Sequence, residues 1–156
     1  MASPISSCAR AATSHEAAYR IDYPLAAARN TRVIALDEQA AEVVRTASSQ
    51  EWAQAKFYEV KDPGHDVVAT DGTTCPLAGE LEDSNTVIMV SVTGENSEAA
   101  ATIGAACKVR GIMTAGLAIS GEPGLDALTV LRPVARVLLV PAELDDLVEL
   151  LRATRA

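Results

Sequence analysis

The 156-residue sequence has few aromatic side chains, namely one Trp, three Tyr and one Phe. So few rings exclude a large stacking surface for nucleic-acid bases. Cysteine is also scarce: Cys8, Cys75 and Cys107 form no CxxC pair. Their odd number and irregular spacing exclude a zinc knuckle and a disulfide framework, and they favour a reducing compartment. We therefore predict a cytoplasmic protein.

Positive charge and long apolar runs are lacking as well. The chain has 13 Lys and Arg residues against 21 Asp and Glu residues, a formal net charge of −8. This acidic field would repel a phosphate backbone, so we expect no nucleic-acid partner. The longest uncharged apolar run, 86–93, is far shorter than the ~20 residues of a membrane helix. We expect no membrane association.

What the sequence does contain is enough apolar residues, 49%, to bury the core of one domain without disulfides or metals. Residues 1–30 show no sustained period, apart from the short alternation of Tyr19, Ile21 and Tyr23. We predict an N-terminal arm over 1–30 and a single domain over 31–156. The apolar part of the arm, at 19–25, favours an exchange with a neighbouring copy and hence a homo-oligomer, a dimer.

From residue 31 onward, apolar runs alternate with helical patterns. The runs typical of strands cover 32–36, 56–60, 86–92, 112–119 and 136–140. Helical periodicity covers 39–48, 97–110, 125–131 and 143–153, and 65–76 has the composition of a loop. This order predicts an α/β fold, a Rossmann-like three-layer sandwich of about five mostly parallel strands with helices on both faces.

The stretch that best fits a ligand site is the loop SVTGENS at 91–97, which joins a predicted strand to a predicted helix. Ligands of open parallel sheets gather where such loops lead into helix N-termini. The candidate phosphate-binding residues are Ser91, Thr93, Gly94, Asn96 and Ser97. Two acidic residues nearby, Glu95 and Glu98, complement the helix dipole themselves. A capped crossover without a ligand is therefore the alternative interpretation.

Part of the chain resembles known families. The run VIMVSVTGENSEAAATIGAACKVRGIMTAGLAI, at 87–119, resembles the central segment of the tubulin-like cell-division GTPases (the FtsZ family), and VLLVPAEL at 137–144 resembles a later strand of that family. The resemblance implies a nucleotide-binding fold. The phosphate-wrapping motif GGGTGTG of the family is replaced here by VTGENSE, and LDEQ stands at the first loop. The resemblance therefore implies the fold without the glycine loops that bind GTP.

The same loop is also similar to that of the phosphosugar-binding SIS domains, which reads roughly SxSGxTxE. Ser91, Thr93, Gly94, Asn96 and Glu98 occur in matching order. This resemblance implies a sugar phosphate or another phosphorylated small molecule as the ligand.

The remaining polar residues suggest little chemistry. In the predicted loop 62–76, His65 and Cys75 lie near carboxylates, a combination that a thiol enzyme needs, although solvated turns often have this composition. Asp37 follows the first strand and is expected to cap the next helix. We predict no metal site and no cofactor.

Two functional hypotheses remain. The first is a non-catalytic or regulatory module with a degenerate nucleotide-binding-like fold, which acts through protein contacts or oligomerisation. The alternative is a small-molecule binding domain or isomerase-like enzyme that uses the loop 91–97 for a sugar phosphate or nucleotide.

Overall fold

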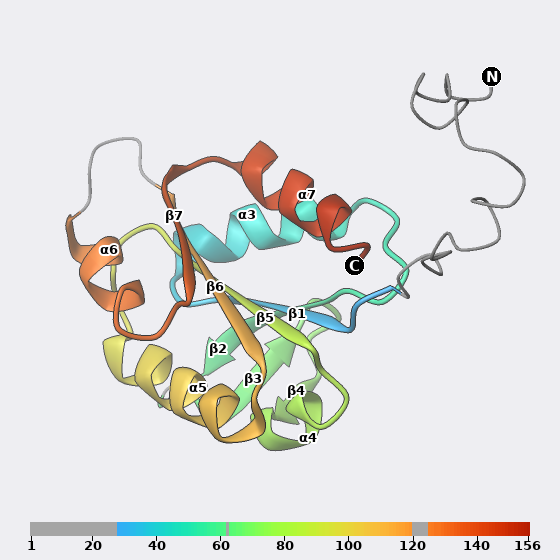
Figure 1. Ribbon diagram of the computed structural model, residues 1–156, viewed down its shortest axis with the longest axis horizontal. Coiled ribbons are helices and arrows are strands. Elements are labelled where there is room, and N and C mark those ends of the chain that lie inside the picture. The colour runs from blue at the N-terminus through green and yellow to red at the C-terminus, as the bar shows by residue number, and fades with distance from the viewer. Residues whose placement is uncertain (1–27, 62, 120–124) are drawn as a thin grey trace, which may run out of the picture.

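A computed structural model describes residues 28–61, 63–119 and 125–156 (Figure 1). The predicted arm thus lies outside the described residues, except for 28–30. Strands and helices alternate along most of the chain. Their order is β1 (Thr31–Ala35), α3 (Glu38–Ser48), β2 (Lys56–Lys61), β3 (Asp66–Ala69), β4 (Thr74–Pro76), α4 (Leu77–Leu81), β5 (Thr86–Ser91), α5 (Ser97–Arg110), β6 (Met113–Ile119), α6 (Leu125–Leu131), β7 (Val137–Ala142) and α7 (Leu144–Ala153).

One sheet of seven strands organises the fold, in the order β4-β3-β2-β1-β5-β6-β7. The five strands from β2 to β7 in this order run parallel, whereas β3 and β4 are antiparallel additions at one edge. The protein is therefore α/β with a mostly parallel sheet. The expected count of about five strands is not confirmed, because β3 and β4 lie in the region 65–76, whose composition predicts a loop.

The central strands are apolar on both faces because helices cover both. On β1, Val33 and Ala35 pack with α3 and α7, whereas Ile34, together with Leu36 just after the strand, packs with α4, α5 and α6. Figure 1 shows the same division, with α3 and α7 on one side of the sheet and α5 and α6 on the other. All five residues of β1 and all six of β5 are buried. Burial on both faces explains why these strands read as continuous apolar runs.

The connections define where loops meet. The crossover after β1 runs through α3 to β2 on one side, and the crossover after β5 runs through α5 to β6 on the other. Because β1 and β5 are parallel neighbours, their carboxyl ends lie side by side. The connections that follow them then lead to opposite halves of the sheet. This is a topological switch point, the usual place for a ligand in open α/β sheets.

The two edges of the sheet differ. The edge strand β4 has only three residues, whereas β7 has six and leaves Val137 48% and Val140 45% exposed. Met113, on the neighbouring strand β6, is 39% exposed. Within the described residues, no helix has the length and hydropathy needed to cross a membrane.

Candidate functional site

The switch point is organised around Asp37, which is separated from the end of β1 by Leu36. Its backbone is extended, and its Oδ1 accepts a hydrogen bond from the amide of Ala40 at 2.8 Å. Asp37 is therefore the N-cap of α3, as the sequence predicts, and its negative charge lies at the positive end of the helix dipole. The residue is only 6% exposed.

The second oxygen of Asp37 reaches across the switch point to the loop after β5. Oδ2 accepts hydrogen bonds from the Ser91 hydroxyl at 2.9 Å, the Val92 amide at 2.8 Å and the Thr93 amide at 3.2 Å. Hydrogen bonds of this kind to a charged carboxylate are stronger than neutral ones. One buried carboxylate thus joins residues that are more than fifty positions apart in the chain.

The rest of the loop is hydrogen-bonded to itself and to β1. The Gly94 amide donates to Ser91 Oγ at 3.1 Å, and the Asn96 side-chain amide donates to the Leu36 carbonyl at 2.6 Å. Gly94 has a φ of +80°, and an added Cβ there would lie 2.4 Å from the carbonyl carbon of Asp126 in α6. Glycine is therefore required at this position for backbone conformation and for the approach of α6.

The five residues predicted for the site lie on this one turn. Ser91 is buried at the end of β5, Thr93 and Gly94 are half-buried, and Asn96 and Ser97 are exposed at the start of α5. Asn96, the N-cap of α5, is left-handed, with a φ of 58°. Several donors that a phosphate would need already have acceptors within the chain: the Ser91 hydroxyl and the amides of Val92, Thr93 and Gly94.

A shallow hollow of about 320 Å³ lies beside the switch point, at the carboxyl ends of β1 and β2. Three carboxylates line it, those of Asp37, Glu38 and Glu59, with Arg45 as the basic residue. Arg45 is paired to Glu59 at 2.7 Å, so its charge is already compensated. The hollow therefore has an excess of negative charge, which disfavours a phosphorylated ligand.

The structure does not assemble a thiol-enzyme site. His65 is exposed just before β3, and the Cys75 thiol on β4 lies 3.9 Å from the Thr73 carbonyl oxygen. No hydrogen bond joins the two side chains among the described residues. Asp71 accepts a hydrogen bond from the Thr73 amide at 2.8 Å, and this bond lowers the pKa of the exposed carboxyl group. No group of His, Cys, Asp and Glu residues suited to a metal ion occurs in the part of the chain that the structure describes.

Cys107 is a core residue, as expected for a thiol on the apolar face of a helix. It is fully buried on α5, and this burial raises the pKa of its thiol to about 11. The thiolate form that reacts with electrophiles is therefore rare at neutral pH.

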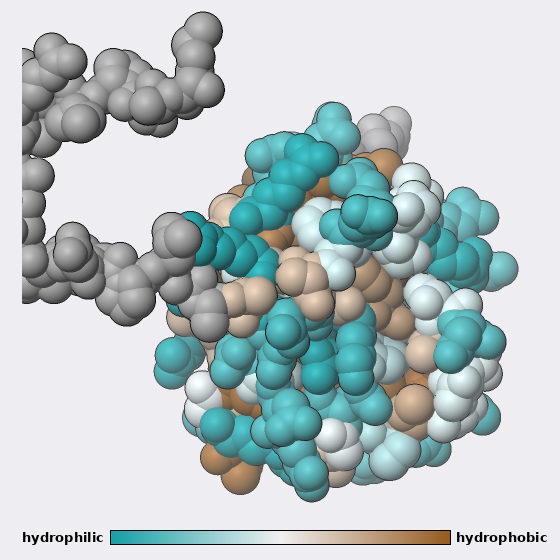
Figure 2. Space-filling view, turned by 90° about the vertical axis from the view of Figure 1, so that its right-hand side faces the viewer, coloured by the Kyte–Doolittle hydropathy of each residue, from teal (hydrophilic) through white to brown (hydrophobic). Residues whose placement is uncertain are grey.

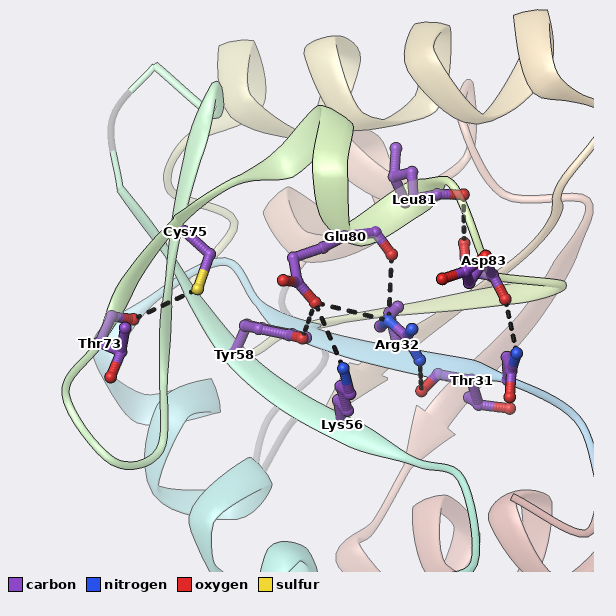
Figure 3. A network of polar contacts seen from close by, with 11 residues as sticks. Thr31, Arg32, Lys56, Tyr58, Thr73, Cys75, Glu80, Leu81 and Asp83 are labelled. Atoms are coloured by element: carbon purple, nitrogen blue, oxygen red, sulfur yellow. Dashed lines mark hydrogen bonds and ion pairs between the residues drawn. The ribbon is translucent and has the colours of Figure 1, made fainter.

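A second polar cluster lies under α4, and sequence reasoning missed it (Figure 3). Glu80 of α4 accepts a hydrogen bond from the Tyr58 hydroxyl, and the same Oε2 lies 3.9 Å from both Arg32 Nε and Lys56 Nζ. Burial, together with the bond to Glu80, raises the pKa of Tyr58. The signal was an arginine within an otherwise apolar, buried strand: Arg32 is only 5% exposed.

Comparison with known proteins adds no relative. The sequence matches no protein-family description and no curated protein sequence. The resemblances to the FtsZ family and to SIS domains therefore stay predictions.

Proposed function

We propose that this chain is a cytoplasmic, non-catalytic α/β module, a Rossmann-like three-layer sandwich that acts through protein contacts. The observation that carries the proposal is the position of the Asp37 carboxylate, which accepts hydrogen bonds from three donors of the switch-point loop. In nucleotide-binding proteins with open parallel sheets, loop amides and helix N-termini at this place hold a phosphate. Here a carboxylate of the chain itself takes the part of that anion.

The competing function is that of a small-molecule binding domain or isomerase-like enzyme. A sugar phosphate or nucleotide at Ser91, Thr93 and Ser97 would have to displace Asp37 from its donors or bind beside it. Either route brings a phosphate against the carboxylates of the adjoining hollow. This repulsion is why we favour the non-catalytic module.

The test is to remove the internal carboxylate while keeping the helix cap. Asp37→Ser retains an N-cap residue of similar rank but lacks Oδ2. In ¹⁵N-resolved NMR titrations with inorganic phosphate, we expect saturable shifts of the Val92 and Thr93 amides in Asp37→Ser and none in the wild type. Glu38→Gln is the matched control, because it removes one charge beside the switch point without freeing these donors. It should behave as the wild type.

The opposite result would identify the competing function. Saturable shifts of the Val92 and Thr93 amides in the wild type, on addition of a sugar phosphate or GTP, would show that the loop binds a ligand despite Asp37. The proposal that the Asp37 carboxylate takes the place of a bound anion would then be wrong.

For the protein contact itself we propose a homodimer formed along the β7 edge. Val137 and Val140 on β7 and Met113 on β6 are each more than a third exposed. An edge strand with apolar side chains is a template for pairing with another chain. Val137→Lys should convert a dimer into a monomer in light-scattering measurements, whereas Gln39→Lys, which adds the same charge on exposed α3, should not. A monomeric wild-type protein would contradict this contact.

A further inference from the structure

Arg32 is unusual because it is a nearly buried charge whose hydrogen bonds are incomplete. A guanidinium group carries five N–H donors. Nε donates to the Glu80 carbonyl at 3.1 Å, and Nη1 donates to the Thr31 carbonyl at 3.4 Å. The other N–H groups, including both on Nη2, have no acceptor among the described residues. Among the described residues, Thr86 Oγ1 is the only fully buried side-chain polar atom without a partner, so these N–H groups of Arg32 are not sealed in the core and a ligand can reach them from the hollow that Arg32 lines.

The carboxylate near Arg32 does not compensate it fully. Glu80 Oε2 is 3.9 Å from Arg32 Nε, beyond hydrogen-bond distance, and it is shared with Lys56 at the same distance and with the Tyr58 hydroxyl (Figure 3). Two cations therefore share one carboxylate.

Arg32 and Lys56 both line a hollow of about 310 Å³ at the amino ends of β1 and β2. The other side chains that line it are neutral, except for Asp83; the full lining is Asn30, Arg32, Ala53, Gln54, Ala55, Lys56 and Asp83. The Asp83 carboxylate forms no ion pair with Arg32 or Lys56 within 4.0 Å. Figure 2 shows the molecule from the side on which β1 begins, and its surface there is mainly hydrophilic, which suits a polar ligand.

We propose that this hollow binds the carboxylate group of a small molecule. The planar guanidinium of Arg32 presents unpaired N–H groups that match a carboxylate in a two-point contact, and Lys56 supplies a second positive charge. A singly charged carboxylate tolerates the neighbouring Glu80 and Asp83 better than a doubly charged phosphate does. The site is separate from the switch point, which lies at the opposite, carboxyl ends of the strands.

The experiment titrates the full chain with acetate, a carboxylate with a single negative charge, as the probe, against sodium chloride at equal ionic strength. The readout is the ¹⁵N-resolved signal of the Arg32 Nε–H group and of the Lys56 amide. We expect saturable shifts of both signals in the wild type. Shifts that rise linearly without saturation, or saturable shifts only elsewhere in the chain, would overturn the proposal.

Two charge variants at exposed positions give effects of opposite sign. Lys56→Gln should weaken acetate binding about two- to fivefold, and Asp83→Asn should tighten it by a similar factor, the range expected for one exposed charge pair. Lys108→Gln, which removes an exposed lysine of α5, is the matched control and should leave the affinity unchanged. Equal affinities in all four proteins would overturn the proposal.

Arg32 itself is tested with a substitution that keeps its charge. Arg32→Lys should abolish saturable binding, because a lysine has no planar fork, while circular dichroism reports whether the fold is retained. If this variant does not fold, the opposite effects of Lys56→Gln and Asp83→Asn still decide the question.

Discussion

Replacement of Asp37 by asparagine tests whether its carboxylate holds the two halves of the sheet together. Asparagine keeps the size of the side chain and can still cap α3 through its oxygen. Its amide nitrogen, however, would face the Val92 and Thr93 amides, which now donate to Oδ2 at 2.8 and 3.2 Å. Donors would then oppose donors at a position that is 6% exposed.

The magnitude follows from the donors that lose their acceptor. Each buried donor without an acceptor costs about 1–3 kcal/mol, and neighbouring losses are not fully additive. We expect Asp37→Asn to lower the free energy of unfolding by about 3 kcal/mol, or the Tm by roughly 6–12 °C for a chain of this size. This is a large fraction of the ~5–15 kcal/mol that stabilises a typical domain.

Urea unfolding followed by tryptophan fluorescence measures this loss directly. Trp52 is the single tryptophan, half-buried with its ring 6.4 Å from that of Phe57 and remote in sequence from the switch point. Glu38 is the exposed neighbour of Asp37 and serves as the control. Glu38→Gln should change the free energy of unfolding by no more than about 1 kcal/mol. A stability of Asp37→Asn within about 0.5 kcal/mol of the wild type would refute the bridging role.

Three further predictions concern other parts of the structure. Gly94→Ala should destabilise the protein by about 2 kcal/mol or more in the same urea assay, because it combines a positive φ with a clash against α6; an unchanged midpoint would contradict the packing. Iodoacetamide at pH 8 should label Cys75 and spare Cys107 in the native protein, as peptide mass spectrometry would show, because Cys107 is buried with a pKa of about 11. The pKa of Tyr58 is raised above its ordinary 10.0, so the folded state holds this proton more tightly and stability should fall as pH rises above that value. Tyr58→Phe should lose that part of the alkaline slope, and identical slopes would contradict the prediction.

The sequence predicts the elements whose determinants are local. The apolar run at 86–92 indicates a central strand, and β5 is buried along its whole length. The helix predicted over 97–110 coincides with α5 because Gly111 supplies the left-handed C-cap. The hairpin of β3 and β4 was missed because its strands, of four and three residues, are too short to show a period, so their pairing defines them as strands.

The candidate site shows the same division between local and non-local information. The cap at Asp37 follows from its place before a helix, but its bond to Ser91 depends on β1 and β5 being neighbours, which no short pattern encodes. Arg32 poses a related problem: a charge in an apolar strand indicates a buried partner, yet the partner comes from α4, nearly fifty residues later. Sequence reasoning located the loop but not the carboxylate that binds it.

The internal carboxylate also explains how a chain without glycine loops keeps this architecture. Divergence of two crossovers at the switch point leaves amide donors there, and buried donors need acceptors. A nucleotide-binding protein meets that need with the phosphate of its ligand and with glycines that let it approach. In this chain Asp37 is present in every molecule, so the donors are satisfied without a ligand. The absence of a glycine-rich loop and the presence of a buried acid after the first strand are thus consistent with one physical requirement, an acceptor for these donors.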